Sequence, residues 1–229
     1  MNQRLTKLRH NLAEAGLDAL LISTFENRLY ISGFSGSAGF LFITDSQLIL
    51  ASDSRYTEQA SIQAKFFTIK RISAKLDWFA DLLESSGAKK IGFEADDISV
   101  NMHQSLLSEC NKSNSDKRKQ IEMVGTSNFV GNLRQVKTPN EIQILKRVCS
   151  ITDQAMDIVT PNIVAGMTEK ELSWLLEQAM RNLGGEKISF DVIVAAGPNG
   201  ALPHHRPDSS IIKSGDSVVI DMGLSLIHI

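Results

Sequence analysis

Apolar residues in the first half of the chain form short runs that alternate with helical repeats. Leu5, Leu8 and Leu12 recur at the spacing of an α-helix, and Gly16 is placed to end it. A short continuous apolar run at residues 18–22 is typical of a buried strand. The same reasoning predicts further strands at 40–43, 48–51, 66–69 and 90–93, and helices at 57–63, 76–83 and 100–109. This alternation predicts an α/β domain with a mixed or parallel sheet.

The second half opens with two longer helical stripes. Thr138–Glu141 and Thr168–Glu171 are both capping boxes, in which a threonine side chain and a glutamate three residues later satisfy the free backbone groups of a helix start. We therefore expect one helix after Thr138 and another after Thr168, the second ending at Gly184. We interpret both apolar stripes as core packing. The first stripe comprises Ile142, Leu145, Val148, Thr152, Ala155, Met156 and Val159.

Two β-branched runs follow these helices, and each leads to a group that can do chemistry. Residues 192–194 and 218–220 predict two strands, with Gly-Pro-Asn-Gly turn residues after the first. The chain reaches His204 and His205 after that turn, and the second run ends on Asp221. A carboxylate after a buried strand needs a cation or hydrogen-bond donors. From the residues alone, Asp221 either binds a cation or accepts hydrogen bonds from the following turn.

Composition narrows the function classes. The chain has 229 residues, is 42% hydrophobic and 22% charged, and carries a net charge of −2. These values are typical of a soluble globular protein and favour neither a nucleic-acid nor a membrane partner. We find no signal-peptide pattern and predict a cytoplasmic protein. Cys110 and Cys149 have no metal-ligand spacing, so we expect reduced helix residues.

A polar stretch at Gly125–Asn128 divides the chain into two predicted domains, residues 1–127 and 128–229. The polar run at 111–119 is basic but carries no aromatic residue, so we interpret it as a solvated loop. We expect the first domain to fold independently.

The Ser189–Gly223 block resembles the catalytic domain of the creatinase/aminopeptidase P/prolidase family of metallopeptidases. The resemblance rests on S-F-D-x-I-V-A-x-G, L-P-H and G-D-x-V-x-x-D-x-G, in that order and at fitting spacings. It implies an amino-terminal creatinase/prolidase-type α/β domain followed by the first part of a pita-bread α+β catalytic domain.

The family resemblance implies roles for individual residues. Asp221 matches the first ligand of a two-metal centre, for which Mn²⁺ is the expected ion and Co²⁺ or Zn²⁺ the alternatives. His204 matches the active-site histidine, and Phe190 could line the substrate pocket or belong to the core. Neighbouring residues of an extended segment point to opposite sides. We therefore expect His205 to face away from the site and its loss to matter little.

The amino-terminal half resembles the same family. Tyr30–Gly39 reads as a glycine-rich bend and resembles a segment of bacterial Xaa-Pro peptidases, and Asp53–Tyr56 resembles their D-x-R-Y motif. The resemblance implies that Arg55 and Tyr56 reach a peptide substrate, perhaps in a neighbouring subunit. Alternatively, Asp53 caps the helix at 57–63 and Arg55 pairs locally.

The resemblance implies hydrolysis of peptides with proline in second position by a metal-activated hydroxide, in a homodimer. A Xaa-Pro dipeptidase, a non-catalytic protein-binding module and a metal-free hydrolase are the alternatives. The family's second Asp, later His and two Glu ligands have no counterpart after Gly223, and we do not assign His228 as a ligand. We therefore expect a truncated or chimeric chain that is inactive on its own.

Overall fold

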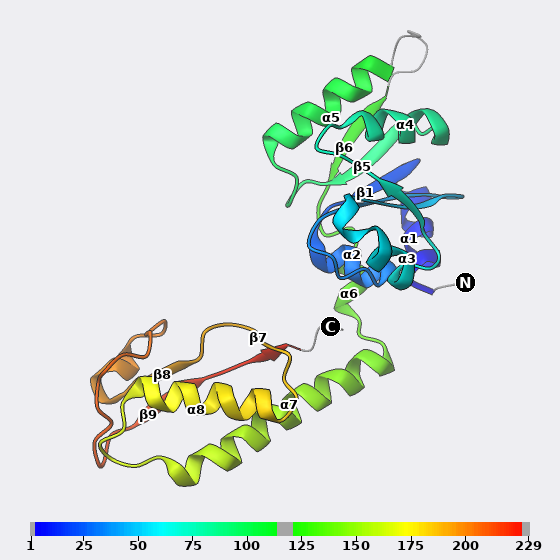
Figure 1. Ribbon diagram of the computed structural model, residues 1–229. Helices are drawn as coiled ribbons and strands as arrows, with labels where there is room; N and C mark the ends of the chain where they lie inside the picture. The colour runs from blue at the N-terminus through cyan, green and yellow to red at the C-terminus, as the bar shows by residue number, and fades with distance from the viewer. Residues whose placement is uncertain (1–2, 114–120, 226–229) are drawn as a thin grey trace. The chain divides into compact units, whose positions relative to one another are not determined.

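The computed structural model describes residues 3–113 and 121–225, which form two compact units, Met1–Val136 and Lys137–Ile229 (Figure 1). The division falls later than residue 127 because Phe129, Val130 and Leu133 pack on the hydrophobic core of the first unit. His228 and residues 114–119 of the predicted loop lie outside the described residues, whereas residues 111–113 belong to a helix rather than to a loop. That the first unit folds independently stays a prediction.

The first unit is built on a mixed sheet, as predicted, and this sheet has six strands. Its strand order is β4-β3-β2-β1-β5-β6. The β1–β2 and β2–β3 pairs are antiparallel, whereas β3–β4, β1–β5 and β5–β6 are parallel. The strands span Ala19–Ile22 (β1), Phe40–Thr44 (β2), Leu48–Ser52 (β3), Thr68–Arg71 (β4), Lys90–Glu94 (β5) and Glu122–Thr126 (β6).

Helices cover both faces of this sheet because side chains alternate along its central strands. Leu20 and Ile22 of β1 belong to one core with helices α1, α2 and α3, whereas Ala19 and Leu21 belong to a second core with α4 and α5. The helices span Gln3–Glu14 (α1), Phe25–Ser32 (α2), Thr57–Gln63 (α3), Asp77–Ser86 (α4) and Val100–Ser113 (α5).

Three features of the first unit differ from the prediction. Tyr30 belongs to helix α2, which ends at the left-handed Gly33, so only the later part of the glycine-rich stretch is a bend. Strand β6 was not predicted, and its residues are only half-buried or exposed. Strand β4 begins at Thr68, two residues after the predicted start at Phe66.

The second unit begins with two helices whose starts are the predicted capping boxes. Helix α7 (Pro139–Val159) and helix α8 (Glu169–Asn182) each show both reciprocal hydrogen bonds of the box. They follow the short helix α6 (Gly131–Gln135) of the first unit. Their packed faces form one core with the following strands.

The predicted apolar stripe of α7 is buried only toward its carboxyl end. Ile151, Ala155 and Val159 are buried, but Ile142 is 42% exposed and Leu145 is 37% exposed. The 14-residue α8 is shorter than the 21-residue α7. Within the described residues, it leaves the amino-terminal part of α7 uncovered.

Two short antiparallel strand pairs complete the second unit. Strand β8 (Ile193–Ala196) pairs with β9 (Val218–Asp221), and β7 (Lys187–Ile188) pairs with β10 (Leu224–Ser225). A 3-10 helix, Gly197–Ala201, follows β8 and contains the predicted Gly-Pro-Asn-Gly turn. The β8–β9 pair packs on α8 through Val194, which is fully buried.

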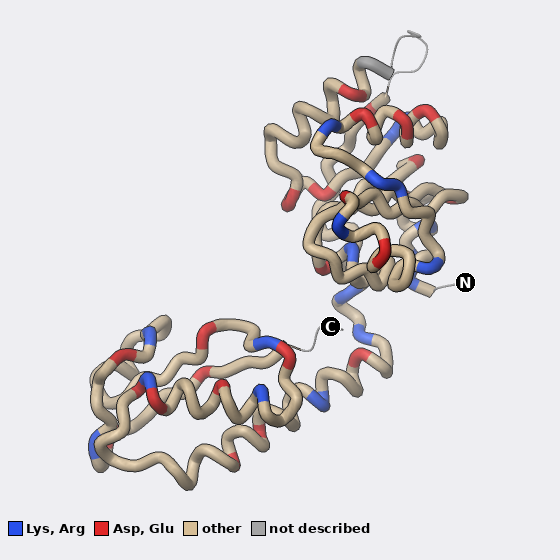
Figure 2. The backbone as a smooth tube through the Cα atoms, in the orientation of Figure 1, with Lys and Arg blue, Asp and Glu red and all other residues tan. Residues whose placement is uncertain are grey.

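Lysines and arginines are intermixed with acidic residues along both units rather than separated by sign (Figure 2). Cys110 and Cys149 lie on α5 and α7 as free thiols, and burial raises the pKa of Cys110 to about 11. Within the described residues, no helix combines the length and apolar character needed to cross the membrane.

The packing of residues 129–136 gives a test of the unit boundary. Val130 is fully buried, Tyr30 donates a hydrogen bond to the Leu133 carbonyl, and Arg134 donates one to the Asn27 side chain. A fragment ending at residue 136 should unfold cooperatively, at a higher temperature than one ending at 127. Loss of Val130 burial alone should cost about 2 kcal/mol. Equal melting temperatures for the two fragments would place the boundary at the earlier position.

Candidate active site

Three residues singled out from the sequence lie around one pocket beside the β8–β9 pair. Asp221, the last residue of β9, is paired in register with Ile193, the first residue of β8. The pocket has a volume of about 390 Å³. Its lining residues are Phe190, Asp191, Ile193, His204, His205, Arg206, Pro207 and Asp221.

The side chains of Asp221 and His204 are both exposed. Among the described residues, neither side chain makes a hydrogen bond or ion pair, so their polar atoms are available to a ligand. A carboxylate and an imidazole in one pocket can bind a cation or exchange protons with a substrate. The predicted buried strand before Asp221 is in fact half-buried to exposed, so Asp221 does not need a cation to offset burial, and its role as a metal ligand stays a prediction.

Gly223 allows the wall of this pocket to form. A Cβ atom at this position would overlap Ser189 Oγ and lie 2.7 Å from Phe190 Cε1. The Ser189 amide also donates a 3.0 Å hydrogen bond to the Gly223 carbonyl. The glycine of the D-M-G sequence thus permits close approach of the segment that carries Phe190, which is 42% exposed.

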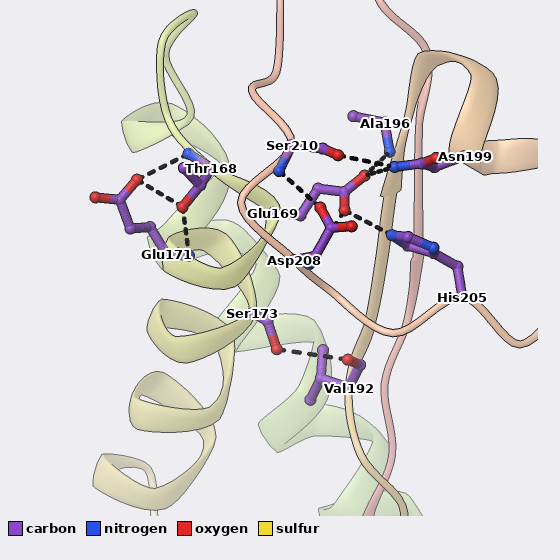
Figure 3. Close-up of polar contacts among 10 residues, drawn as sticks. All are labelled: Thr168, Glu169, Glu171, Ser173, Val192, Ala196, Asn199, His205, Asp208 and Ser210. Carbon is purple, nitrogen blue, oxygen red and sulfur yellow. Dashed lines mark hydrogen bonds and ion pairs between the residues drawn. The ribbon is translucent and has the colours of Figure 1, made fainter.

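A buried carboxylate, which the sequence analysis did not single out, fixes the loop between the two strands. Glu169, the first residue of α8, is fully buried. Figure 3 shows its polar contacts. Its Oε1 accepts hydrogen bonds from the Ala196 amide at 2.7 Å and from Asn199 Nδ2 at 3.0 Å. Its Oε2 lies 2.6 Å from His205 Nε2 and 3.4 Å from the Asp208 amide nitrogen. We call these five residues the Glu169 cluster.

His205 is therefore a structural residue of this unit. Its side chain is only 10% exposed, and its ring nitrogen is bonded to the carboxylate. Both His204 and His205 line the pocket, so the expected division into a site-facing and an outward-facing histidine is not seen. The prediction that the loss of His205 would matter little considered only the substrate, and removing it would leave a buried carboxylate short of a donor.

Opposing influences act on the pKa of Glu169. Burial alone would raise this pKa, because a charged group loses hydration. The hydrogen bonds from Ala196, Asn199, His205 and Asp208 outweigh burial and hold the pKa below its ordinary value. Glu169 is therefore an ionised acceptor at neutral pH, and His205 Nε2 is the donor.

The Glu169 cluster contains a possible metal-binding group. Potential ligand atoms of Glu169, His205 and Asp208 all lie within 4.8 Å of one another. However, a carboxylate offers about four lone-pair positions. The four donors named above occupy those of Glu169, so a metal ion would have to displace them.

The Asp221 pocket fits one ligand position of a two-metal centre but not a whole centre. Asp221 and Asp191 supply carboxylates and His204 an imidazole. Within the described ranges, however, Asp221 is not part of any cluster of three metal-ligating side chains. Two divalent ions need several anionic oxygens to offset their mutual repulsion. No metal-dependent step therefore follows from these residues alone.

The structure places Arg55 and Tyr56 in the first unit, on a 3-10 helix at Ser54–Tyr56. Asp53 caps that helix rather than α3, and its carboxylate binds Arg55 Nη2 at 2.8 Å. Hydrogen bonds from Arg55 lower the pKa of Asp53. The Tyr56 hydroxyl lies 2.7 Å from Ser37 Oγ. Arg55 therefore pairs locally, as the alternative interpretation expected. Substrate binding by Arg55 or Tyr56 stays a prediction.

Glu169, Asp191 and Arg206 were not predicted from the sequence. Glu169 occurs within the capping box, where Thr168 and Glu171 explain the pattern without it. Asp191 and Arg206 each neighbour a residue that was singled out, and their facing the pocket depends on backbone geometry that residue spacing does not reveal.

The lowered pKa of Glu169 predicts a pH-dependent contribution to stability. A pKa lower in the folded state than in the unfolded state stabilises the fold above the unfolded value, and this contribution is lost as pH falls through the folded value. Glu169→Gln should lower the melting temperature at pH 7 by on the order of 10 °C. The difference in melting temperature between this variant and the wild type should narrow below about pH 4. A difference independent of pH would contradict this account.

Comparison with known proteins follows the division into two units. Residues 4–136 match the creatinase/prolidase N-terminal domain, and residues 143–228 match metallopeptidase family M24. The chain is 34% identical over 221 residues to the uncharacterized peptidase YqhT of Bacillus subtilis, covering 96% of this chain and 60% of the relative.

Solved structures give the same picture. The Xaa-Pro dipeptidase from Bacillus anthracis is 34% identical with a TM-score of 0.87, covering 97% of this chain and 60% of that protein. The X-Pro aminopeptidase from Thermotoga maritima is 31% identical with a TM-score of 0.84, covering 97% and 61%. The chain thus spans about 60% of the length of these relatives. Because the creatinase/prolidase N-terminal domain matches more than half of the chain and part of an M24 domain follows it, the chain belongs to the creatinase/prolidase family of metallopeptidases.

Proposed function

We propose that the Asp221 pocket is part of the active site of a metal-dependent peptidase that hydrolyses the bond before proline. The observation that carries this proposal is the convergence of Phe190, His204 and Asp221 on one pocket. The names of the relatives from Bacillus anthracis and Thermotoga maritima support the substrate class. An aminopeptidase that accepts peptides with proline in second position is the first choice, and a dipeptidase is the alternative.

The chemistry of the bond explains why such residues are needed. The nitrogen of an Xaa-Pro bond carries no hydrogen, and the ring blocks close approach of a backbone, so the enzyme loses contacts it would make to other peptides. Bound metal ions would supply a hydroxide nucleophile and polarise the carbonyl. Three residues of this chain have proposed roles in this chemistry. Asp221 would be one ligand, His204 would donate a hydrogen bond to the developing oxyanion, and Phe190 would contact the substrate.

Other parts of the proposal rest on the family resemblance. Mn²⁺ is the proposed ion, with Co²⁺ and Zn²⁺ as alternatives, because carboxylates with an imidazole suit all three. Arg55 and Tyr56 are proposed to contact the substrate, within a homodimer in the cytoplasm.

A non-catalytic binding module on the same fold is the second candidate. It is favoured by the incomplete donor set around Asp221 among the described residues. The free side chains of Asp221 and His204 favour the peptidase, because a binding module has no need to keep both polar groups unpaired in a pocket. Metal-dependent turnover distinguishes the two candidates.

The 229-residue chain on its own should not cleave an Xaa-Pro peptide with Mn²⁺, because Asp221 alone cannot hold two ions. A chimera that continues after Gly223 with the remaining residues of the Bacillus anthracis relative should cleave it. Calorimetric titration with Mn²⁺ and a peptide assay measure both outcomes. Tight binding of two ions or turnover by the 229-residue chain would contradict the conclusion that its residues do not form a whole two-metal centre. A folded chimera that binds Mn²⁺ but leaves the peptide intact would favour the binding module.

Substitutions in the active chimera test the individual roles. Asp221→Asn should abolish metal-dependent cleavage, because the amide cannot replace an anionic ligand. His204→Ala should lower kcat by roughly 10²–10³ while leaving metal binding intact, as expected for a lost donor to an oxyanion. The exposed Arg181→Ala on α8 is the matched surface control and should keep full activity. A His204→Ala variant with unchanged kcat would remove His204 from the catalytic machinery.

A further inference from the structure

The segment that carries His204 has little regular structure of its own. Between the 3-10 helix that ends at Ala201 and strand β9, residues 202–217 form no helix and no strand, apart from an isolated bridge between Ile211 and Thr168. A segment without ladder hydrogen bonds holds its conformation only if other groups restrain it. A catalytic side chain on this segment therefore needs an external anchor.

Glu169 restrains this segment on both sides of His204. Before it, Asn199 Nδ2 donates to Oε1 and also lies 3.2 Å from Ser210 Oγ. After it, the His205 ring and the Asp208 amide meet Oε2. Backbone bonds add to this tether, since the Glu169 amide donates to Ser210 and the Lys170 amide donates to Asp208. One buried carboxylate thus bridges both ends of the turn that presents His204.

The orientation of His205 sets the orientation of its neighbour. The two histidines are neighbours in a turn closed by a 3.1 Å hydrogen bond from the His205 amide to the Leu202 carbonyl, so fixing the His205 ring restricts the backbone that carries His204. Both histidines line the pocket, but the His205 ring is bonded to the buried Glu169 whereas His204 is exposed. The 2.6 Å contact between His205 Nε2 and Oε2 therefore restricts the direction that His204 faces.

From these contacts we infer that Glu169 is a positioning residue that holds His204 toward the Asp221 pocket through His205, Asn199 and Asp208. This inference rests on the proposed function for its catalytic consequence. Its structural part concerns the 229-residue chain alone. A metal-ligand role for Glu169 would instead require its donors to leave.

Hydrogen exchange on the 229-residue chain tests the structural part without any activity. In Glu169→Gln, the side-chain oxygen can still accept from Ala196 and Asn199, but the amide group cannot accept from His205 or Asp208. The amides of His205 and Asp208 should exchange on the order of 10-fold faster than in the wild type. Amides of β1 in the first unit should be unchanged.

A matched control separates positioning from general destabilisation. Leu176 is fully buried on the same helix, seven residues after Glu169 and about 10 Å along its axis. A Leu176 variant, to Val or Ala, is chosen to match the melting temperature of Glu169→Gln. It should speed exchange across the second unit evenly. If Glu169→Gln gives the same even pattern, or leaves His205 and Asp208 unchanged, the inference is overturned.

The chimera tests the catalytic part. Below the melting temperatures, Glu169→Gln should lower kcat at least ~10-fold with KM within about 2-fold, because a misplaced donor affects the transition state more than the bound substrate. The Leu176 variant should keep the wild-type kcat. An unchanged kcat in Glu169→Gln would overturn the inference. A wild-type chimera that folds but cleaves nothing would defeat the proposed function, while the exchange experiment would still decide the positioning role.

Discussion

A carboxylate with no exposure to water is costly unless donors surround it, and Glu169 meets this condition with four of them. The donors come from the end of β8, from the 3-10 helix after it and from the loop that follows. Removal of any one leaves a buried charge partly unsatisfied, so the donors constrain one another through this shared acceptor. The path of the chain between β8 and β9 depends on this arrangement.

The pocket depends in turn on that path. Strand β9 brings Asp221 level with the start of β8, and Gly223 lets the Phe190 segment approach closely. These two features build one wall from short-range geometry. His204 and Arg206, which also line the pocket, belong to the loop that Glu169 restrains. The scaffold and the candidate chemistry are therefore linked by one hydrogen-bond cluster.

Local patterns predicted most of the elements, because their signals lie within a few residues. The two capping boxes gave the starts of α7 and α8, and β-branched runs gave β8 and β9. Helix α2 was missed because glycines after Ser32 suggested a turn, and β6 because its edge residues are not strongly apolar. Convergence of His204 and Asp221 was expected from the family resemblance. The Glu169 cluster was not, because its contacts join residues 27 to 39 positions apart.

Asp221 and Glu169 are both carboxylates near histidines, but we propose that Asp221 faces a metal site whereas Glu169 serves the fold. Anomalous X-ray scattering from crystals of the chimera grown with Mn²⁺ distinguishes the two most directly. The account predicts a manganese peak within about 2.5 Å of an Asp221 carboxylate oxygen and none beside Glu169. A peak between Glu169, His205 and Asp208, with none at Asp221, would contradict it.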